Sequence, residues 1–243
     1  MTSQIRTEIQ TVGFIGAGRI GSAVARLAVD AGYDVVLSNS RGPETLADLV
    51  ADLGPRARAA SREEAAEAAD ALVVTIPLHA VGDVPVAPLD GTIVLDTNNY
   101  YPDRDGHVAA LDEHRATTSG LLQEHLPGAH VVKVFGTINS EAIVPLARPS
   151  GDPERCALPV FGDDADAKAR AVALLDRLGY DVHDGGGLDE SWRAENGQPA
   201  YGMPYATDGD MARPRPASAD EIAALLARAD REDVELMTFA APE

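Results

Sequence analysis

Apolar positions along the chain fall into two alternating patterns. Runs that are apolar throughout predict buried strands at 12–15, 33–38, 71–77, 92–99 and 130–136, with a short further strand at 57–60. Between these runs, apolar residues recur at helical spacing, as in 20–31, 43–53 and 61–70. Strands that are apolar on both faces and alternate with helices predict an α/β fold with a parallel sheet covered on both sides.

The pattern becomes less regular after residue 150. Two apolar runs, 157–162 and 180–183, flank a helical pattern at 166–178 and predict a strand–helix–strand extension. Residues 184–217 are rich in Gly, Pro and Tyr and predict a long loop, and residues 218–230 predict a terminal helix. A loop of this length is unusual in a compact domain, so its part from 192 to 216 is a candidate functional segment.

A glycine motif directly follows the first predicted strand. Gly16, Gly18 and Gly21 form the pattern G-x-G-x-x-G at the start of a helix, which is the context that gives this motif its meaning. Gly16 permits a tight turn, Gly18 lets a pyrophosphate approach the backbone, and Gly21 allows close packing of helix and strand. The motif predicts a Rossmann-type doubly wound sheet that binds a dinucleotide through the segment Gly16, Ala17, Gly18, Arg19, Ile20 and Gly21.

The end of the second strand indicates which dinucleotide is bound. An acid commonly stands here to bind the ribose hydroxyls, but this chain has Ser38, Asn39, Ser40 and Arg41. Hydroxyls and a guanidinium pair with a 2′-phosphate, which a carboxylate would repel. We therefore predict NADP(H) as the cofactor; the alternative is that Arg41 is only a solvated loop residue.

Polar residues after the later strands are candidates for chemistry. Ile76, Pro77 and His79 follow the fourth strand and could border the nicotinamide ribose. Asn98 and Thr137 follow the next two strands and are predicted to orient a ring, while His79 is the candidate general acid. The alternative for His79 is a loop residue that only touches the cofactor.

Two further features leave their alternatives open. Lys133 lies in an apolar strand and is either a buried functional lysine or a lysine whose ammonium group exits at the end of the strand. The aromatic residues of the long loop form either a lid over a ring or a satellite cluster that pins the tail; they are Trp192, Tyr201, Met203 and Tyr205.

Composition excludes several classes of function. The 243 residues are 45% hydrophobic, enough for one sizeable core, and a net charge of −19 argues against binding to nucleic acid. The chain lacks an apolar run of the roughly 20 residues that a membrane span needs. Cys156 is the only cysteine and the histidines have no ligand spacing, so we predict no disulfide and no metal site. The N-terminus lacks a secretory signal pattern, so a cytoplasmic protein is expected.

The chain resembles the F420-dependent NADP reductases. The resemblance rests on "GFIGAGRIGSAVA", "SNSRGPETL", "VVTIP" and "VVKVFGTI" and extends over residues 11–183. It implies a Rossmann domain at 1–140, a small C-terminal extension at 141–243 for substrate or dimer contacts, and a homodimer. It also implies hydride transfer between NADPH and a deazaflavin, F420, whose tail bears a phosphate and several glutamates. Such a tail would require a local group of arginines, with Arg104, Arg148, Arg155 and Arg193 as candidates.

Two other functions fit the same residues. One is an NADPH-dependent reductase of a small carbonyl or imine compound, which would need a proton donor. The other is an NADP(H)-sensing protein without turnover. The sequence shows no Ser-His-Asp arrangement and no paired carboxylates, which fits hydride transfer to an acceptor that carries its own redox ring.

Overall fold

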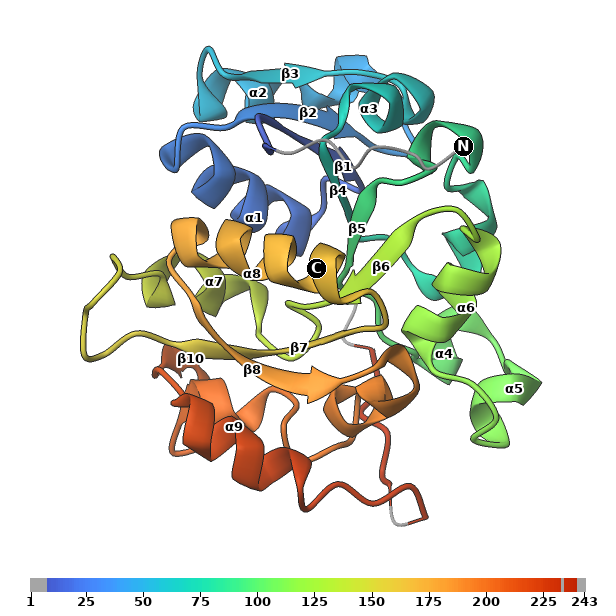
Figure 1. The fold of residues 1–243 in the computed structure, drawn as a ribbon, viewed down its shortest axis with the longest axis vertical. Coiled ribbons are helices and arrows are strands. Elements are labelled where there is room, and N and C mark those ends of the chain that lie inside the picture. Colours follow the sequence, from blue (N-terminus) through green and yellow to red (C-terminus); the bar gives the residue numbers. More distant parts are fainter. Residues whose placement is uncertain (1–7, 233, 240–243) are drawn as a thin grey trace.

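Strands and helices alternate through the first half of the chain (Figure 1). The computed structural model describes residues 8–232 and 234–239. The elements up to residue 133 are β1 (Thr11–Ile15), α1 (Arg19–Asp30), β2 (Asp34–Ser38), η1 (Pro43–Leu46), α2 (Ala47–Leu53), β3 (Ala57–Ala59), α3 (Arg62–Ala68), β4 (Ala71–Val74), η2 (Leu78–Asp83), η3 (Ala87–Leu89), β5 (Ile93–Asp96), α4 (Pro102–Asp105), α5 (Ala109–Asp112), α6 (Thr118–His125) and β6 (His130–Lys133).

The remainder of the chain adds a shorter set of elements. These are α7 (Ser140–Leu146), β7 (Ala157–Gly162), α8 (Ala165–Leu178), β8 (Asp181–Gly186), η4 (Leu188–Ala194), η5 (Met203–Tyr205), β9 (Ala206–Thr207), β10 (Asp210–Pro214) and α9 (Ala219–Leu226). The predicted strand–helix–strand extension is confirmed as β7, α8 and β8.

One sheet runs through both halves of the molecule. Its strand order is β3-β2-β1-β4-β5-β6-β7-β8, and the strands from β3 to β6 are all parallel. Strand β7 joins antiparallel to β6, with Val132 opposite Gly162 and Lys133 opposite Phe161, and β8 lies parallel to β7. The Rossmann-type α/β fold is confirmed. The division into domains at residue 140 stays a prediction, because the extension continues the same sheet.

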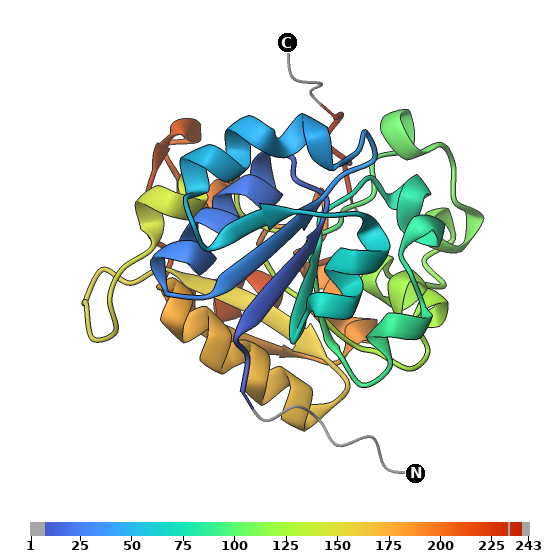
Figure 2. The same cartoon turned by 90° about the horizontal axis from the view of Figure 1, so that it is seen from above.

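Helices cover both faces of this twisted sheet, as seen in Figure 2. The sequence of β1 is apolar throughout because both faces of the strand are buried. Of two adjacent side chains, Phe14 belongs to the larger apolar cluster and Ile15 to the second one. The larger cluster contains side chains of α1, α7 and α8, and the second contains side chains of α3, η2 and α6.

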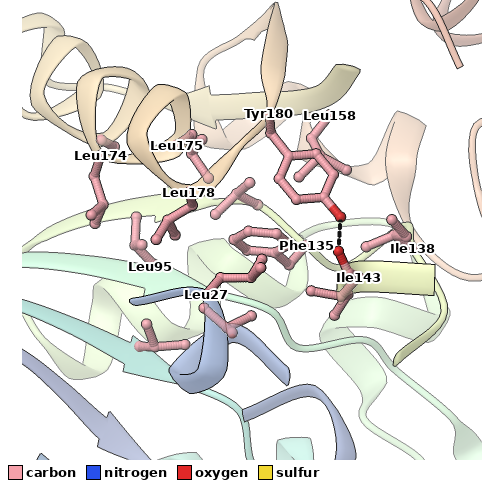
Figure 3. Packing of buried hydrophobic residues seen from close by; sticks show 14 of the residues in the cluster. Leu27, Leu95, Phe135, Ile138, Ile143, Leu158, Leu174, Leu175, Leu178 and Tyr180 are labelled. Carbon is pink, nitrogen blue, oxygen red and sulfur yellow. Dashed lines mark hydrogen bonds between the residues drawn. The ribbon is translucent and has the colours of Figure 1, made fainter. Parts of the chain in front are cut away.

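The larger cluster joins the extension to the Rossmann strands (Figure 3). Leu174, Leu175 and Leu178 of α8 lie in it with Leu95 of β5. Phe135 meets Tyr180 edge to face at a centroid distance of 5.5 Å, and the Tyr180 hydroxyl donates a hydrogen bond to the Ile143 carbonyl. A single continuous core therefore holds the two predicted segments together.

Several predicted elements are wrong in extent; for example, β4 ends at Val74 and β5 at Asp96, each three residues before the predicted end. Strand β6 ends at Lys133 rather than residue 136, and Phe135 takes a left-handed backbone conformation with a φ of 60°, which a strand cannot continue through. The segment 184–217 is not a plain loop, because it contains the end of β8, the turns η4 and η5, and the antiparallel ribbon β9–β10. These short elements were not predicted, because the many Gly and Pro residues of the segment interrupt its apolar pattern.

The N-caps of α3 and α9 differ in completeness. At α3 the Ser61 hydroxyl accepts from the Glu64 N–H at 3.1 Å, and the Glu64 carboxylate accepts from the Ser61 N–H at 2.9 Å. At α9 the Ser218 hydroxyl accepts from the Glu221 N–H at 3.1 Å, but the Glu221 carboxylate pairs with Arg215 instead. The reciprocal half of the second capping box is thus replaced by an ion pair.

Cys156 lies just before β7 in the core. Its thiol is fully buried, and burial raises its pKa to about 11. Within the described residues, no helix has the length and apolar character to cross a membrane, and no group of His, Cys, Asp and Glu is placed to hold a metal ion.

Candidate functional site

The glycine turn after β1 has the geometry that its sequence predicts. Gly16 has a φ of 103°, and a Cβ added to it would lie 2.1 Å from the Thr75 carbonyl oxygen. A Cβ on Gly21 would lie 2.3 Å from the Gly16 carbonyl oxygen, so this helix can approach the strand only with glycine there. A Cβ on Gly18, by contrast, would have no protein atom within 4 Å. Gly18 therefore leaves space that a ligand can fill.

Helix α1 presents an open N-terminus at this turn. Gly18 is its N-cap residue and supplies no side-chain hydrogen bond, and the first turn of the helix contains no acidic residue. The first N–H groups of a helix have no partner within the helix, and the helix dipole adds a partial positive charge there. These features together suit an anion such as a pyrophosphate.

A cleft of about 520 Å³ opens beside the glycine turn. Its walls come from the ends of β1, β2 and β4 and from the start of α3, as expected for the carboxyl edge of a parallel sheet. The lining residues are Ile15, Gly16, Ala17, Gly18, Asn39, Ser40, Arg41, Arg62, Thr75, Ile76, Pro77, His79, Ala80 and Asp83. Most of the residues predicted to bind the cofactor are thus brought together in one cleft.

Asn39 shapes the loop that follows β2. Its Oδ1 accepts hydrogen bonds from the N–H groups of Arg41 at 3.0 Å and Gly42 at 2.9 Å, and its Nδ2 donates to Thr45 Oγ1 at 2.9 Å. The turn presents Ser40 and Arg41 as exposed side chains on the cleft wall. Asn39 therefore positions the two residues that could pair with a phosphate.

Ser38 does not take the predicted role. It is the last residue of β2, its side chain is fully buried, and its hydroxyl donates to the Phe14 carbonyl at 2.8 Å. This geometry gives no support to a phosphate contact of Ser38, because its hydroxyl is buried and already donates to the Phe14 carbonyl.

Arg19 and Ile20 also lie outside the cleft lining. Arg19 is the first residue of α1, and its guanidinium lies 3.6 Å from the Glu141 carboxylate. Ile20 packs against the larger apolar cluster. Only their main-chain N–H groups, at the start of the helix, remain candidates for contact with a ligand.

Arg62 is a cleft residue that the sequence analysis missed. It is the first residue of α3, and its Nη1 lies 2.9 Å from Oδ2 of Asp83, which also lines the cleft. The signal was available, since the Ser61 capping box places Arg62 at a helix start that follows β3, the neighbour of β2. A second guanidinium therefore stands in the same cleft as Arg41.

His79 has a carboxylate partner. The imidazole is half-exposed in the cleft, and its Nδ1 lies 3.2 Å from Oδ1 of Asp105. Burial opposes ionisation of Asp105, but hydrogen bonds from Arg104 and from the Tyr101 N–H outweigh it and lower the pKa of this carboxyl. His79 lines the same cleft as Arg41 and Arg62.

Asn98 lies buried behind the cleft wall. Its Oδ1 accepts from the Ile76 N–H at 3.3 Å, and its own N–H donates to Asp96 Oδ1 at 2.9 Å. The side chain is 3% exposed, and among the described residues its Nδ2 has no hydrogen-bond partner. A buried amide without a partner is costly in a native structure and marks a donor that a ligand could use.

Lys133 is buried and does not exit at the end of β6. Its Nζ donates to the Asn98 carbonyl at 2.7 Å and to Thr118 Oγ1 at 2.8 Å. The carboxylates of Asp96 and Glu195 lie 3.8 Å and 4.0 Å from the same nitrogen. The hydrogen bond from the ammonium group therefore holds the main-chain carbonyl of Asn98 in place.

Thr137 lies away from the cleft. Its Oγ1 is 3.2 Å from the Tyr205 hydroxyl, and its carbonyl accepts from the Gly202 N–H at 2.8 Å. Burial raises the pKa of the Tyr205 phenol, which keeps it a neutral hydrogen-bonding group. Thr137 thus anchors the tail, a position that gives no support to the predicted role of orienting a ring.

The aromatic residues of the long loop take different positions. The Tyr201 hydroxyl is hydrogen-bonded to that of Tyr101, and Tyr205 is buried, so these two pin the tail as the second alternative predicts. Met203 is exposed. Trp192 has the guanidinium groups of Arg193 and Arg231 near its ring, at 4.5 Å and 4.6 Å from the centroid.

Comparison with known proteins identifies the nucleotide-binding part of the chain. Residues 11–100 match the family described as NADP oxidoreductase, coenzyme F420-dependent. This stretch contains the glycine turn, the loop with Arg41, and the ends of β4 and β5.

Two solved structures have a similar fold. A hypothetical protein from Sinorhizobium meliloti is 28% identical, with a TM-score of 0.69 over 79% of this chain and 93% of the other. A protein from Arthrobacter sp. FB24 assigned as an F420-dependent NADP-reductase is 24% identical, with a TM-score of 0.63 over 76% and 87% of the two chains.

A more distant neighbour shares the fold alone. The 3-hydroxyisobutyrate dehydrogenase of Mycobacterium tuberculosis is 16% identical, with a TM-score of 0.53 over 75% of this chain and 56% of the dehydrogenase. Residues 11–100, less than half of the chain, are thus similar to the F420-dependent NADP oxidoreductase family, and the chain is an NADP-dependent oxidoreductase.

Proposed function

We propose that this chain transfers hydride between NADP(H) and the deazaflavin F420 or a flavin-like acceptor. The observation that carries the proposal is the single cleft that contains the glycine turn, the open N-terminus of α1 and two guanidinium groups. The family match covers the same residues. The acceptor part of the proposal rests on the resemblance to the family.

Each part of the cleft has a role in holding NADP(H). Main-chain N–H groups from Gly18 to Gly21 suit the pyrophosphate. Ser40 and Arg41 from the β2 loop, with Arg62 from α3, suit the 2′-phosphate. Bound NADPH supplies the hydride from its nicotinamide ring.

Asn98 would orient the nicotinamide half of the cofactor. Its unpartnered Nδ2 supplies one donor, and its Oδ1 holds the Ile76 N–H next to Pro77 on the cleft wall. Lys133 holds the Asn98 main chain and so limits the freedom of this amide. The protein's contribution is orientation, which is what hydride transfer between two redox rings requires.

The four arginines considered for the acidic tail of F420 are already engaged. Arg104 pairs with Asp105, Arg155 with Asp176 and Asp181, and Arg193 with Glu190. Arg148 donates to the carbonyls of Pro145 and Ala147. F420 binding would therefore use rearranged arginines, and a flavin without the acidic tail would not need them.

His79 favours a second candidate, the reduction of a small carbonyl or imine compound. A histidine whose Nδ1–H donates to a carboxylate has Nε2 free, and in the imidazolium form this nitrogen carries a proton that it could donate. This role requires the acceptor to reach the half-exposed imidazole in the cleft.

NADPH oxidation by the purified chain tests the proposal. F420, FMN and a panel of ketones and imines are offered in parallel, and NADPH binding is measured separately by titration. Oxidation with F420 or FMN is the expected result. Oxidation only with the carbonyl or imine panel would replace the acceptor, and tight NADPH binding without oxidation by any of them would leave an NADP(H) sensor.

A homodimer, which the resemblance implies, and a cytoplasmic location are also proposals. Size-exclusion chromatography with light scattering tests the homodimer, since a monomer mass would contradict it.

A further inference from the structure

A second cavity of about 510 Å³ lies apart from the cofactor cleft, and the two share no lining residue. One wall comes from the segment 100–116 after β5, and the other from residues of the tail within 192–198, 231–232 and 234–236. Its volume is within the range of small-molecule sites, roughly 300–1,000 Å³. The family match ends at residue 100, so this cavity lies almost wholly outside it.

The apolar part of the cavity suits a ring or a short aliphatic body. Tyr100, Leu111, Trp192 and Leu236 contribute to its lining. The Tyr100 hydroxyl donates to Asp112 at 2.7 Å and accepts from the Val108 N–H at 3.0 Å, so the ring is held in place on the wall. Rigid apolar walls of this kind favour binding because little side-chain freedom is lost.

Charged groups around the cavity are mostly carboxylates. Asp112, Glu195 and Glu232 line it, together with Arg231, His107 and His114. Arg231 keeps its positive charge, but its two terminal nitrogens donate to the carbonyls of His114 at 2.8 Å and Asp189 at 3.3 Å, and His107 Nδ1 lies 3.2 Å from Asp112 Oδ2. Three carboxylates against one guanidinium give the described lining an excess of negative charge, within a chain of net charge −19, which disfavours anions.

Glu195 is a built part of this wall and not a mobile surface group. Its side chain is 15% exposed, and its Oε1 accepts from the Thr118 N–H at 2.8 Å and from Thr118 Oγ1 at 2.7 Å. The two hydrogen bonds from Thr118 and the Lys133 ammonium group 4.0 Å away hold the Glu195 carboxylate in place beside the cavity. A fixed carboxylate beside an apolar wall is the arrangement that recognises an ammonium group with an apolar body.

We propose that this cavity is a binding site for a small organic cation, such as a primary ammonium carried on an aromatic or aliphatic group. The ammonium group would lie toward the carboxylates, and the apolar body against Tyr100, Leu111 and Trp192. The proposal does not rest on the identity of the hydride acceptor, because the cavity is separate from the cofactor cleft.

Trp192 provides the measurement, because it is the only tryptophan in the chain and lines the cavity. The full chain, without NADPH, is titrated with phenethylammonium, 2-phenylethanol and phenylacetate, which share one body and differ in charge. We expect a saturable change in tryptophan fluorescence with phenethylammonium, and binding at least about tenfold weaker for the alcohol and for phenylacetate. Equal binding of the three probes, tighter binding of phenylacetate, or no saturable response would overturn the proposal.

Variants locate the binding. Glu195→Gln and Glu232→Gln should each weaken phenethylammonium binding several-fold, whereas Glu154→Gln, at an exposed position remote from the lining, should not. Glu232 is exposed, so its variant is expected to fold even where the buried Glu195→Gln does not. Unchanged phenethylammonium affinity in the folded variants would contradict a carboxylate-lined site.

Discussion

At the scale of the residue, four neighbouring side chains at the end of β2 have different tasks. Ser38 closes the strand, Asn39 forms the turn, and Ser40 and Arg41 reach the cleft. The sequence predicted that this group lies at the cofactor cleft, and phosphate recognition by its members stays a prediction. It could not assign the individual tasks, because successive side chains of a strand point in opposite directions and the end of the strand decides which side faces the ligand.

Arg41→Ala should weaken NADPH binding by about 1.5–3 kcal/mol, the range for a hydrogen bond to a charged group. NADH binding should change little, because NADH lacks the 2′-phosphate. Titration of both cofactors against the variant measures this difference. Arg56→Ala is the matched control, since Arg56 is exposed and pairs with Asp34 outside the cleft. Equal losses for NADPH and NADH would refute the phosphate role of Arg41.

Gly18→Ala should weaken binding of both cofactors while leaving the melting temperature nearly unchanged. The added methyl would touch no protein atom but would occupy the space predicted for the pyrophosphate. Gly16→Ala should instead lower the melting temperature, because its φ and the Thr75 carbonyl oppose a side chain. Thermal unfolding and cofactor titration on the two variants separate these effects. Unaltered NADPH affinity in Gly18→Ala would contradict the predicted cofactor position.

Some residue assignments depend on contacts that are distant in the sequence. Thr137 meets Tyr205, and Lys133 meets Asn98 and Thr118, through partners that no local pattern indicates. The geometry of the glycine turn and the position of Arg41 on the cleft wall, in contrast, were predictable because local sequence determines that turn and loop.

At the scale of the element, Lys133 links β5, β6 and α6. Lys133→Met should destabilise the fold by about 3–5 kcal/mol, because it leaves Asp96 and Glu195 without their buried cation. Lys168→Met is the control: Lys168, the other lysine of the chain, pairs with the largely exposed Asp184 and should cost about 1 kcal/mol or less. Urea denaturation measures both. Similar losses of unfolding free energy in the two variants would mean that the buried ion pairs of Lys133 contribute little to stability.

Asp105, the last residue of α4, should make a pH-dependent contribution to the free energy of unfolding. Because the pKa of Asp105 is lowered in the folded protein, its carboxylate stabilises the fold at pH values above the unfolded pKa of about 3.9. This contribution is lost as the pH falls through the lower folded value. Asp105→Asn should therefore cost about 1–3 kcal/mol at neutral pH, and the difference from the parent chain should shrink in acid.

The test is urea denaturation of the parent chain and of Asp105→Asn, carried out from neutral pH down to pH values below the pKa of an ordinary aspartate. Asp48→Asn, on the exposed face of α2, serves as the reference for removing one carboxylate from an acidic chain. A stability difference for Asp105→Asn that stays constant with pH would contradict the ion-pair assignment.

Element prediction succeeded where apolar runs were long. The strands of the Rossmann part and α8 were predictable because burial on two faces or along one stripe leaves a strong pattern. The ribbon β9–β10 and the turns η4 and η5 were not, because they are short, rich in Gly and Pro, and held by side chains far away in the sequence.

At the scale of the whole molecule, the extension and the Rossmann strands share one sheet and one apolar cluster. We therefore expect a single unfolding transition in urea, with Trp192 fluorescence from the tail and far-UV circular dichroism from the whole sheet changing together. Separated transitions would instead support two units that meet near residue 140.

The burial of Cys156 has a consequence for the chemistry that can reach the native protein. A thiol that is sealed in the core and has a pKa of about 11 presents almost no thiolate to its surroundings. Peroxide, nitrosating agents and glutathione thus have no cysteine to modify while the fold is intact, and copies of the chain cannot be crosslinked through sulfur. Oxidants can influence this oxidoreductase by changing the ratio of oxidised to reduced cofactor, but not by modifying a cysteine in the native protein.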